Sequence, residues 1–138
     1  MKDLQKFATV LVIDDNETIR GTLRMLLELE DFVVASCQDG KSGLDLAKKN
    51  HFDVILVDYQ MPALKGDQTT RLLRALCPDA FIIGMSSEEK GQTFHQAGAN
   101  TFIDKQHIVQ KLVDEIRNHF SGQACMCGCG KPGEAVGN

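Results

Sequence analysis

The stretch VLVIDD, residues 10–15, is the part of the sequence that most directly indicates the fold. Four aliphatic residues are followed at once by two carboxylates, Asp14 and Asp15. A short, continuously apolar run is typical of a strand covered on both faces, as in a parallel sheet. Two like charges at the end of a buried strand repel each other and resist the loss of water, so the chain must supply positive charge nearby.

The composition is that of one ordinary globular domain. The chain has 138 residues, of which 43% are hydrophobic and 25% charged, and its net charge is −4. This mild acidity disfavours nucleic-acid binding. No segment approaches the roughly 18 apolar residues of a membrane helix, and the N-terminus lacks the pattern of a signal peptide. We therefore expect a cytoplasmic protein that binds neither nucleic acid nor membrane.

Short apolar runs alternate with stretches of helical periodicity along the chain. The expected strands are 7–13, 32–37, 53–57, 80–85 and 100–103. The expected helices are 17–30, 41–50, 67–76, 88–97 and 107–120. Asn16 is a candidate N-cap for the first helix, and Gly98 is a candidate C-cap for the fourth, which has the weakest pattern. Five such units predict an open parallel α/β sheet with helices on both faces and right-handed crossovers.

Charged and polar residues follow several of these strands. Asp58 ends the third strand, so Asp14, Asp15 and Asp58 meet at one edge of the sheet if the first and third strands are neighbours. A hard divalent cation such as Mg²⁺ would balance these carboxylates. Ser86 ends the fourth strand and Lys105 follows the fifth, which places a hydroxyl and an ammonium at the same edge. Each residue alone would more often be a cap or a surface side chain, but together they indicate a binding site.

The segments VIDD (12–15), VILVDYQMP (54–62), GMSS (84–87) and FIDK (102–105) together resemble the receiver domain of two-component response regulators, over residues 7–120. The resemblance implies a flavodoxin-like (βα)5 doubly wound sandwich with strand order 2-1-3-4-5. We expect a stand-alone receiver domain over residues 1–120, whose output is contact with a protein target that the sequence does not identify. The Gly-rich residues 121–138 are expected to be a flexible tail.

The resemblance also implies a role for each acidic residue. Asp58 would be the phosphoacceptor, modified by a sensor histidine kinase or a histidine phosphotransfer protein. Asp14, Asp15 and Asp58 would hold Mg²⁺ or Mn²⁺ together with the backbone carbonyl of Gln60. Such a chain is a signalling domain rather than an enzyme, although it carries intrinsic self-phosphorylation and autodephosphorylation chemistry.

The same resemblance assigns roles to five side chains around the acidic residues. Lys105 would pair with the phosphoryl oxygens, and Ser86 would donate a hydrogen bond to them. Movement of Ser86 would make room for Phe102, the switch aromatic, and would reshape the face formed by the fourth helix, the fifth strand and the last helix. Gln60 and Glu88 occupy positions that tune phosphate lifetime, and their polar side chains predict a short-lived phosphate.

The chain departs from the family pattern around Lys105. Gln106 stands where the family usually has a proline in a cis peptide. Because a cis bond before a residue other than proline costs roughly 2.5–4 kcal/mol, we expect a trans bond here. The segment between Ser86 and Lys105 is also about one helical turn shorter than usual, so the fourth helix should be short.

Three other interpretations deserve tests. ASCQDGKS (35–42) nearly fits a phosphate-binding loop, which would indicate a small nucleotide hydrolase, but Ala35 replaces the first glycine. DDNET (14–18) resembles the strand-end motif of haloacid-dehalogenase phosphatases, but Asn16 replaces its second acid. The third is an interaction module of the same fold that works without phosphate, in which Asp58→Asn would have no effect.

The cysteines near the C-terminus form a separate feature. Cys125, Cys127 and Cys129 lie in CMCGCGKPG, which resembles the opening of the zinc motif at the end of the SecA translocase. Three thiolates do not complete a tetrahedral zinc site, and no Cys or His follows them. The tail is therefore expected to carry at most a weak thiolate site.

Overall fold

The computed structural model describes the backbone of residues 8–128 and the side chains of residues 8–121. Its strands form one parallel sheet in the order β2-β1-β3-β4-β5, so the predicted topology is confirmed. The strands are β1 (Thr9–Ile13), β2 (Val33–Cys37), β3 (Val54–Asp58), β4 (Phe81–Ser86) and β5 (Thr101–Asp104).

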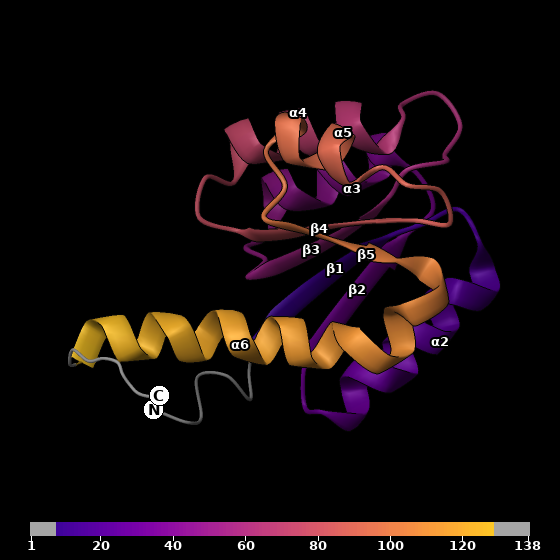
Figure 1. Ribbon diagram of the computed structural model, residues 1–138. Helices are drawn as coiled ribbons and strands as arrows, with labels where there is room; N and C mark the ends of the chain where they lie inside the picture. Colours follow the sequence, from indigo (N-terminus) through magenta and orange to yellow (C-terminus); the bar gives the residue numbers. More distant parts are fainter. Residues whose placement is uncertain (1–7, 129–138) are drawn as a thin grey trace.

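Helices cover both faces of this sheet (Figure 1). They are α2 (Glu17–Leu29), α3 (Gly40–Lys49), α4 (Gly66–Leu76), α5 (Gly91–Ala97) and α6 (Ile108–Gly128), and the 3-10 turn η1 (Lys105–His107) precedes α6. Helices α2 and α6 lie on one face, and α3, α4 and α5 lie on the other (Figure 1). This is the doubly wound arrangement that the alternation of strand and helix patterns predicted.

Alternate residues of each strand feed two separate hydrophobic cores. Val10 and Val12 belong to the core beneath α2 and α6, whereas Leu11 and Ile13 belong to the core beneath α3, α4 and α5. All four side chains are fully buried. Because successive strand residues point to opposite faces, a strand covered on both sides must be apolar throughout, which is what VLVI provides.

Both predicted helix caps are confirmed. The Asn16 side chain accepts a hydrogen bond of 3.0 Å from the Ile19 N–H at the start of α2. Helix α5 ends at Gly98, whose φ of 110° is left-handed and favours glycine.

Helix α5 is shorter than the sequence predicted, because it begins at Gly91 rather than at residue 88. Two side chains hold the preceding segment in a non-helical conformation. The Ser86 hydroxyl accepts a 3.0 Å hydrogen bond from the Glu88 N–H, and the Glu89 carboxylate accepts one of 3.0 Å from the Gly91 N–H. Such local bonds compete with helix formation.

Helix α6 is longer than predicted, because it continues past residue 120 to Gly128. Residues 121–128, which were expected to belong to a flexible tail, are therefore helical. Gln123, Ala124 and Met126 are good helix formers, and the helix ends at a glycine. Cys129 and the side chains of Cys125 and Cys127 lie outside the description, so the thiolate site stays a prediction.

None of the described helices combines the length and the apolar character that crossing a bilayer demands.

Candidate functional site

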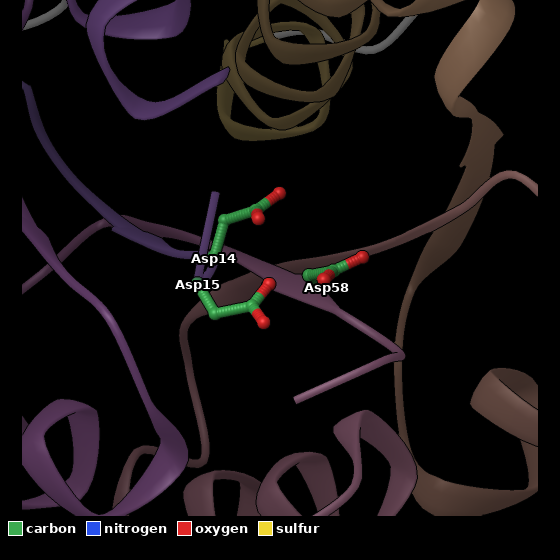
Figure 2. A group of neighbouring side chains, drawn as sticks. All are labelled: Asp14, Asp15 and Asp58. Carbon is green, nitrogen blue, oxygen red and sulfur yellow. The ribbon is translucent and has the colours of Figure 1, made fainter. Parts of the chain in front are cut away.

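The acidic residues come together at the carboxyl edge of the sheet because β1 and β3 are neighbours. Asp14, Asp15 and Asp58 each offer a carboxylate oxygen, and these oxygens lie within 4.8 Å of one another (Figure 2). Asp14 and Asp58 are buried, whereas Asp15 is exposed. The structure thus forms a pocket with two buried acids and a third acid open to solvent.

Lys105 supplies positive charge to this pocket. Its ammonium lies 2.9 Å from Asp14 Oδ2 and 2.9 Å from Asp58 Oδ1. The lysine side chain is itself only 18% exposed, so these ion pairs are poorly screened by water. One ammonium facing three carboxylates still leaves a surplus of negative charge.

The pocket changes the acidity of two of its members. Burial raises the pKa of Asp58 to about 6; the charges of Asp14 and Asp15 add to this effect, and the hydrogen bond and charge of Lys105 oppose it. Burial acts to lower the pKa of Lys105, but its contacts with Asp58 and Asp14 outweigh burial and leave that pKa above its usual value. Near pH 7, Asp58 is therefore mainly ionised and Lys105 is charged.

Asp14 is held in place through several of its atoms. Its Oδ1 accepts a 2.9 Å hydrogen bond from the Asn16 backbone N–H, and its backbone carbonyl accepts one of 2.8 Å from the guanidinium of Arg20. Its Oδ2 is buried and accepts no hydrogen bond within the described residues; its ion-pair partner is the Lys105 ammonium. Three carboxylates, two of them buried, face a single ammonium, and this surplus of negatively charged oxygen atoms fits a hard divalent cation that prefers oxygen ligands.

Arg20 was missed by sequence reasoning. It lies one turn into α2, where an arginine ordinarily faces solvent, and its contact is with a backbone carbonyl. The only available signal was its position one turn beyond Asn16, the N-cap of the same helix.

Ser86 lies at the same edge of the sheet as the acids. Strand β4 pairs with β3 so that Met85 is opposite Asp58, and Ser86 comes directly after Met85. Ser86 is buried, and its hydroxyl oxygen accepts the Glu88 N–H. The strand β5 residue opposite Ser86 is Asp104, which directly precedes Lys105.

Phe102 is half-buried on the face covered by α5. Its ring centroid lies 6.0 Å from that of Phe94. The ring also lies beside Gly91, where an added Cβ would be 3.5 Å from it. The side chain is therefore neither fully inside the core nor fully in solvent.

Gln60 and Glu88 are both exposed, and each lies beside a lysine. Gln60 Oε1 accepts a 3.0 Å hydrogen bond from Lys65 Nζ. The Glu88 carboxylate lies 3.9 Å from Lys90 Nζ, and the Lys90 ammonium lies 4.5 Å from the centre of the Tyr59 ring.

The structure argues against both hydrolase interpretations. Asp39 caps α3 by accepting a 2.8 Å hydrogen bond from the Ser42 N–H, so a carboxylate already occupies the helix end at which a nucleotide phosphate would bind. Asn16, at the position of the second acid of a haloacid-dehalogenase motif, likewise serves as a helix cap.

The five-stranded parallel sheet and the acidic pocket closed by a lysine define a receiver domain of the two-component type. Residues 10–117 match the family model of the response regulator receiver domain. This chain belongs to that family, whose members are signalling domains that interact with histidine kinases or phosphotransfer proteins and with downstream targets.

Full-length regulators are among the relatives. The chain is 35% identical over 119 residues to the response regulator GacA of Pseudomonas aeruginosa, a match that covers 83% of this chain and 56% of that regulator. The chain thus spans about half the length of the curated relatives it matches.

Solved structures show the same fold. The chemotaxis protein CheY4 of Vibrio cholerae is 27% identical, with a TM-score of 0.76, and the match covers 81% of this chain and 98% of that chain. A response regulator from Burkholderia pseudomallei, solved with a phosphorylated aspartic acid, a calcium ion and citrate, is 25% identical with a TM-score of 0.68. That match covers 84% of this chain and 74% of the other.

Proposed function

We propose that this chain is a phosphorylation switch in which Asp58 accepts a phosphoryl group from a histidine kinase or a histidine phosphotransfer protein. The observation that carries the proposal is the Lys105 ammonium, which bridges Asp14 and Asp58 in a buried pocket. A lysine and a set of oxygen ligands around one buried carboxylate are the groups that phosphoryl transfer to that carboxylate requires.

Asp58 is the nucleophile in this proposal. One of its carboxylate oxygens attacks phosphorus, the bond between phosphorus and the donor histidine nitrogen breaks, and an acyl phosphate forms while the histidine nitrogen leaves with the electron pair. The carboxylate must be ionised to attack. A pKa of about 6 keeps it mainly ionised near pH 7, and the Lys105 ammonium beside it can then neutralise charge on the transferred group.

The candidate metal ligands are Asp14, Asp15, Asp58 and the backbone carbonyl of Gln60. They suit Mg²⁺ or Mn²⁺, since both prefer oxygen ligands. When bound, the ion supplies positive charge next to the phosphoryl oxygens. The calcium ion and phosphorylated aspartic acid in the Burkholderia pseudomallei regulator support the assignment by analogy.

Ser86 and Phe102 would convert phosphorylation into a change of surface. The Ser86 hydroxyl oxygen accepts the Glu88 N–H, so its hydrogen remains able to donate to a phosphoryl oxygen. Movement of Ser86 toward the phosphate frees space near β5, and the half-buried Phe102 turns into it. The face formed by α5, β5 and α6 then differs between the two states and selects a protein target.

Mg²⁺-dependent labelling by a small phosphodonor tests this function. The parent should incorporate one phosphoryl group that is labile to base, as acyl phosphates are, and Asp58→Asn should incorporate none. Asp45→Asn, which removes an exposed carboxylate on α3, is the matched control and should behave like the parent. Label that survives Asp58→Asn would refute the assignment.

A further inference from the structure

We propose that Asp104 is a positioning residue for Lys105: its carboxylate caps the turn η1 and so directs the Lys105 ammonium to Asp14 and Asp58. The kinetic part of the test below rests on the proposed function. The geometric part does not.

The location of Lys105 explains why such a device is needed. Strand β5 has four residues and lies at the edge of the described sheet, beside β4, and Lys105 is the first residue after it. The backbone at Lys105 has left the sheet, so hydrogen bonds of the sheet do not fix its direction. Its side chain must nevertheless reach past β4 to the acids at the ends of β1 and β3.

Two hydrogen bonds hold the peptide group that follows Lys105. Its N–H, on Gln106, donates a 2.9 Å bond to Asp104 Oδ1, which closes a turn that spans Lys105. Its carbonyl, on Lys105, accepts a bond from the Ile108 N–H. With this peptide tied both to the residue before Lys105 and to the start of α6, the direction in which the lysine side chain leaves the backbone is restricted.

Asp104 does not compete for the ammonium that it positions. Asp104 is the carboxylate adjacent to Lys105 in sequence, yet the ion pairs of the lysine are with Asp14 and Asp58. The Asp104 carboxylate accepts the Gln106 N–H and is not among the ion-pair partners of the neighbouring ammonium. Asp104 therefore positions the lysine without neutralising it.

Gln106 completes the device, because it provides the N–H that Asp104 accepts. A proline at this position has no N–H and could not be capped in this way. The Lys105–Gln106 peptide is trans, as predicted, since no cis peptide occurs among the described residues. Gln106, which stands where the family usually has proline, thus supplies the backbone N–H that the Asp104 carboxylate accepts.

Three variants separate positioning from simple capping. Asp104→Ala removes the acceptor, and Asp104→Asn keeps an oxygen that can accept the Gln106 N–H. Asp39→Ala removes a cap of the same chemistry, an aspartate that accepts the Ser42 N–H at 2.8 Å, at the start of a helix that does not carry Lys105. All three are compared with the parent by thermal unfolding, by the NMR signals of the Lys105 side chain in the metal-free protein, and by the initial rate of Asp58 phosphorylation.

We expect Asp104→Ala to shift the Lys105 signals and to lower the phosphorylation rate about 10- to 100-fold, the range expected when a reacting group is displaced by an ångström or less. Asp104→Asn should restore both readouts to near parent values. Asp39→Ala should lower the thermal unfolding midpoint by about as much as Asp104→Ala does. It should leave the Lys105 NMR signals and the phosphorylation rate unchanged.

The proposal is overturned if Asp104→Ala leaves the Lys105 signals and the rate at parent values, or if Asp104→Asn is as defective as Asp104→Ala. It is also overturned if Asp39→Ala reproduces the whole effect. If the parent itself is not phosphorylated but Asp104→Ala alone moves the Lys105 signals, the proposed function fails while the positioning role stands.

Discussion

Lys105 and Asp58 form an ion pair of 2.9 Å although strand β4 lies between the strands that precede them. Asp58 ends β3, whereas Lys105 follows β5, so the lysine side chain passes the end of β4 to reach the acid. Ser86, the last residue of β4, lies in the intervening position. A change in the charge of Asp58 would therefore alter the electrostatic environment at the carboxyl ends of β3, β4 and β5.

Lys105→Met is expected to lower the stability of the metal-free protein and, at the same time, to raise its affinity for Mg²⁺. Without the ammonium, Asp14 and Asp58 face each other as buried, unpaired charges, which should lower the free energy of unfolding of the metal-free protein by up to about 3 kcal/mol. Mg²⁺ would no longer compete with the ammonium, so its affinity should rise about tenfold, or 1.4 kcal/mol.

Tyr59 offers a direct readout of that affinity, because it adjoins Asp58 and is the only tyrosine in a chain without tryptophan. Its fluorescence during a Mg²⁺ titration should report metal binding in the parent and in Lys105→Met. Lys90→Met is the control, since Lys90 lies over the Tyr59 ring and its ion pair is with Glu88 rather than with Asp14, Asp15 or Asp58. Equal affinities in the parent and Lys105→Met would contradict the competition.

The raised pKa of Asp58 makes the stability of the metal-free protein depend on pH. The pKa is about 6 in the folded state against an ordinary value of 3.8, so the unfolded chain releases its proton first as pH rises. The stability contributed by protonated Asp58 is present below pH 3.8 and is lost as pH rises through about 6.

Asp58→Asn, which mimics the protonated acid, should therefore stabilise the metal-free protein by about 1–3 kcal/mol at pH 7.5 and have almost no effect near pH 4. Urea unfolding at the two pH values, with Asp45→Asn alongside, measures the difference. If Asp58→Asn raised the free energy of unfolding equally at pH 7.5 and near pH 4, the effect would not come from ionisation of Asp58.

Gln60→Ala and Glu88→Ala are each expected to lengthen the lifetime of phosphorylated Asp58 severalfold. Both side chains are exposed and polar at the positions expected to tune phosphate lifetime, where they could orient the water that hydrolyses the acyl phosphate, and Lys65 Nζ donates a hydrogen bond to the Gln60 amide oxygen. Dephosphorylation is followed after removal of the phosphodonor. Gln68→Ala is the matched control, because Gln68 contacts the Lys65 backbone rather than Gln60. Unchanged lifetimes in both variants would remove this role.

Two glycines should respond in opposite directions to substitution by alanine. A Cβ on Gly84 of β4 would lie 2.3 Å from the Phe94 ring, so Gly84→Ala should cost about 1–3 kcal/mol and loosen α5. A Cβ on Gly21 in α2 meets nothing within 4 Å, so Gly21→Ala should stabilise the protein by about 0.5–1 kcal/mol. Chemical denaturation checks both, and a loss of stability in Gly21→Ala would contradict the described packing of α2.

The sequence predicted the sheet well because strands that are buried on both faces must be continuously apolar, and such runs can be recognised directly in the sequence. It was less successful where side chains bond to the backbone. Helix α5 begins late because Ser86 and Glu89 accept backbone N–H groups, and no periodicity reveals such bonds. The sequence did not predict the end of α6, because glycines interrupt the helix-forming residues after residue 120.

The same division holds for the candidate site. The convergence of Asp14, Asp15 and Asp58 followed from strand order, which the sequence predicted. The contributions of Arg20 and Asp104 did not, because each acts on a backbone group, a carbonyl or an N–H, that every residue possesses. Sequence spacing identifies side chains that meet one another more readily than side chains that orient the main chain.

The ion pairs of Lys105 give the pocket a counter-ion that is part of the chain. A tethered ammonium is present at the same effective concentration in every environment, whereas the supply of a free cation varies. The folded pocket therefore does not depend on a metal for its first positive charge, and in the function proposed above a metal ion would add to or compete with a charge that is already in place. If the proposed function holds, assembly of the domain and readiness to signal are separate events that share one lysine.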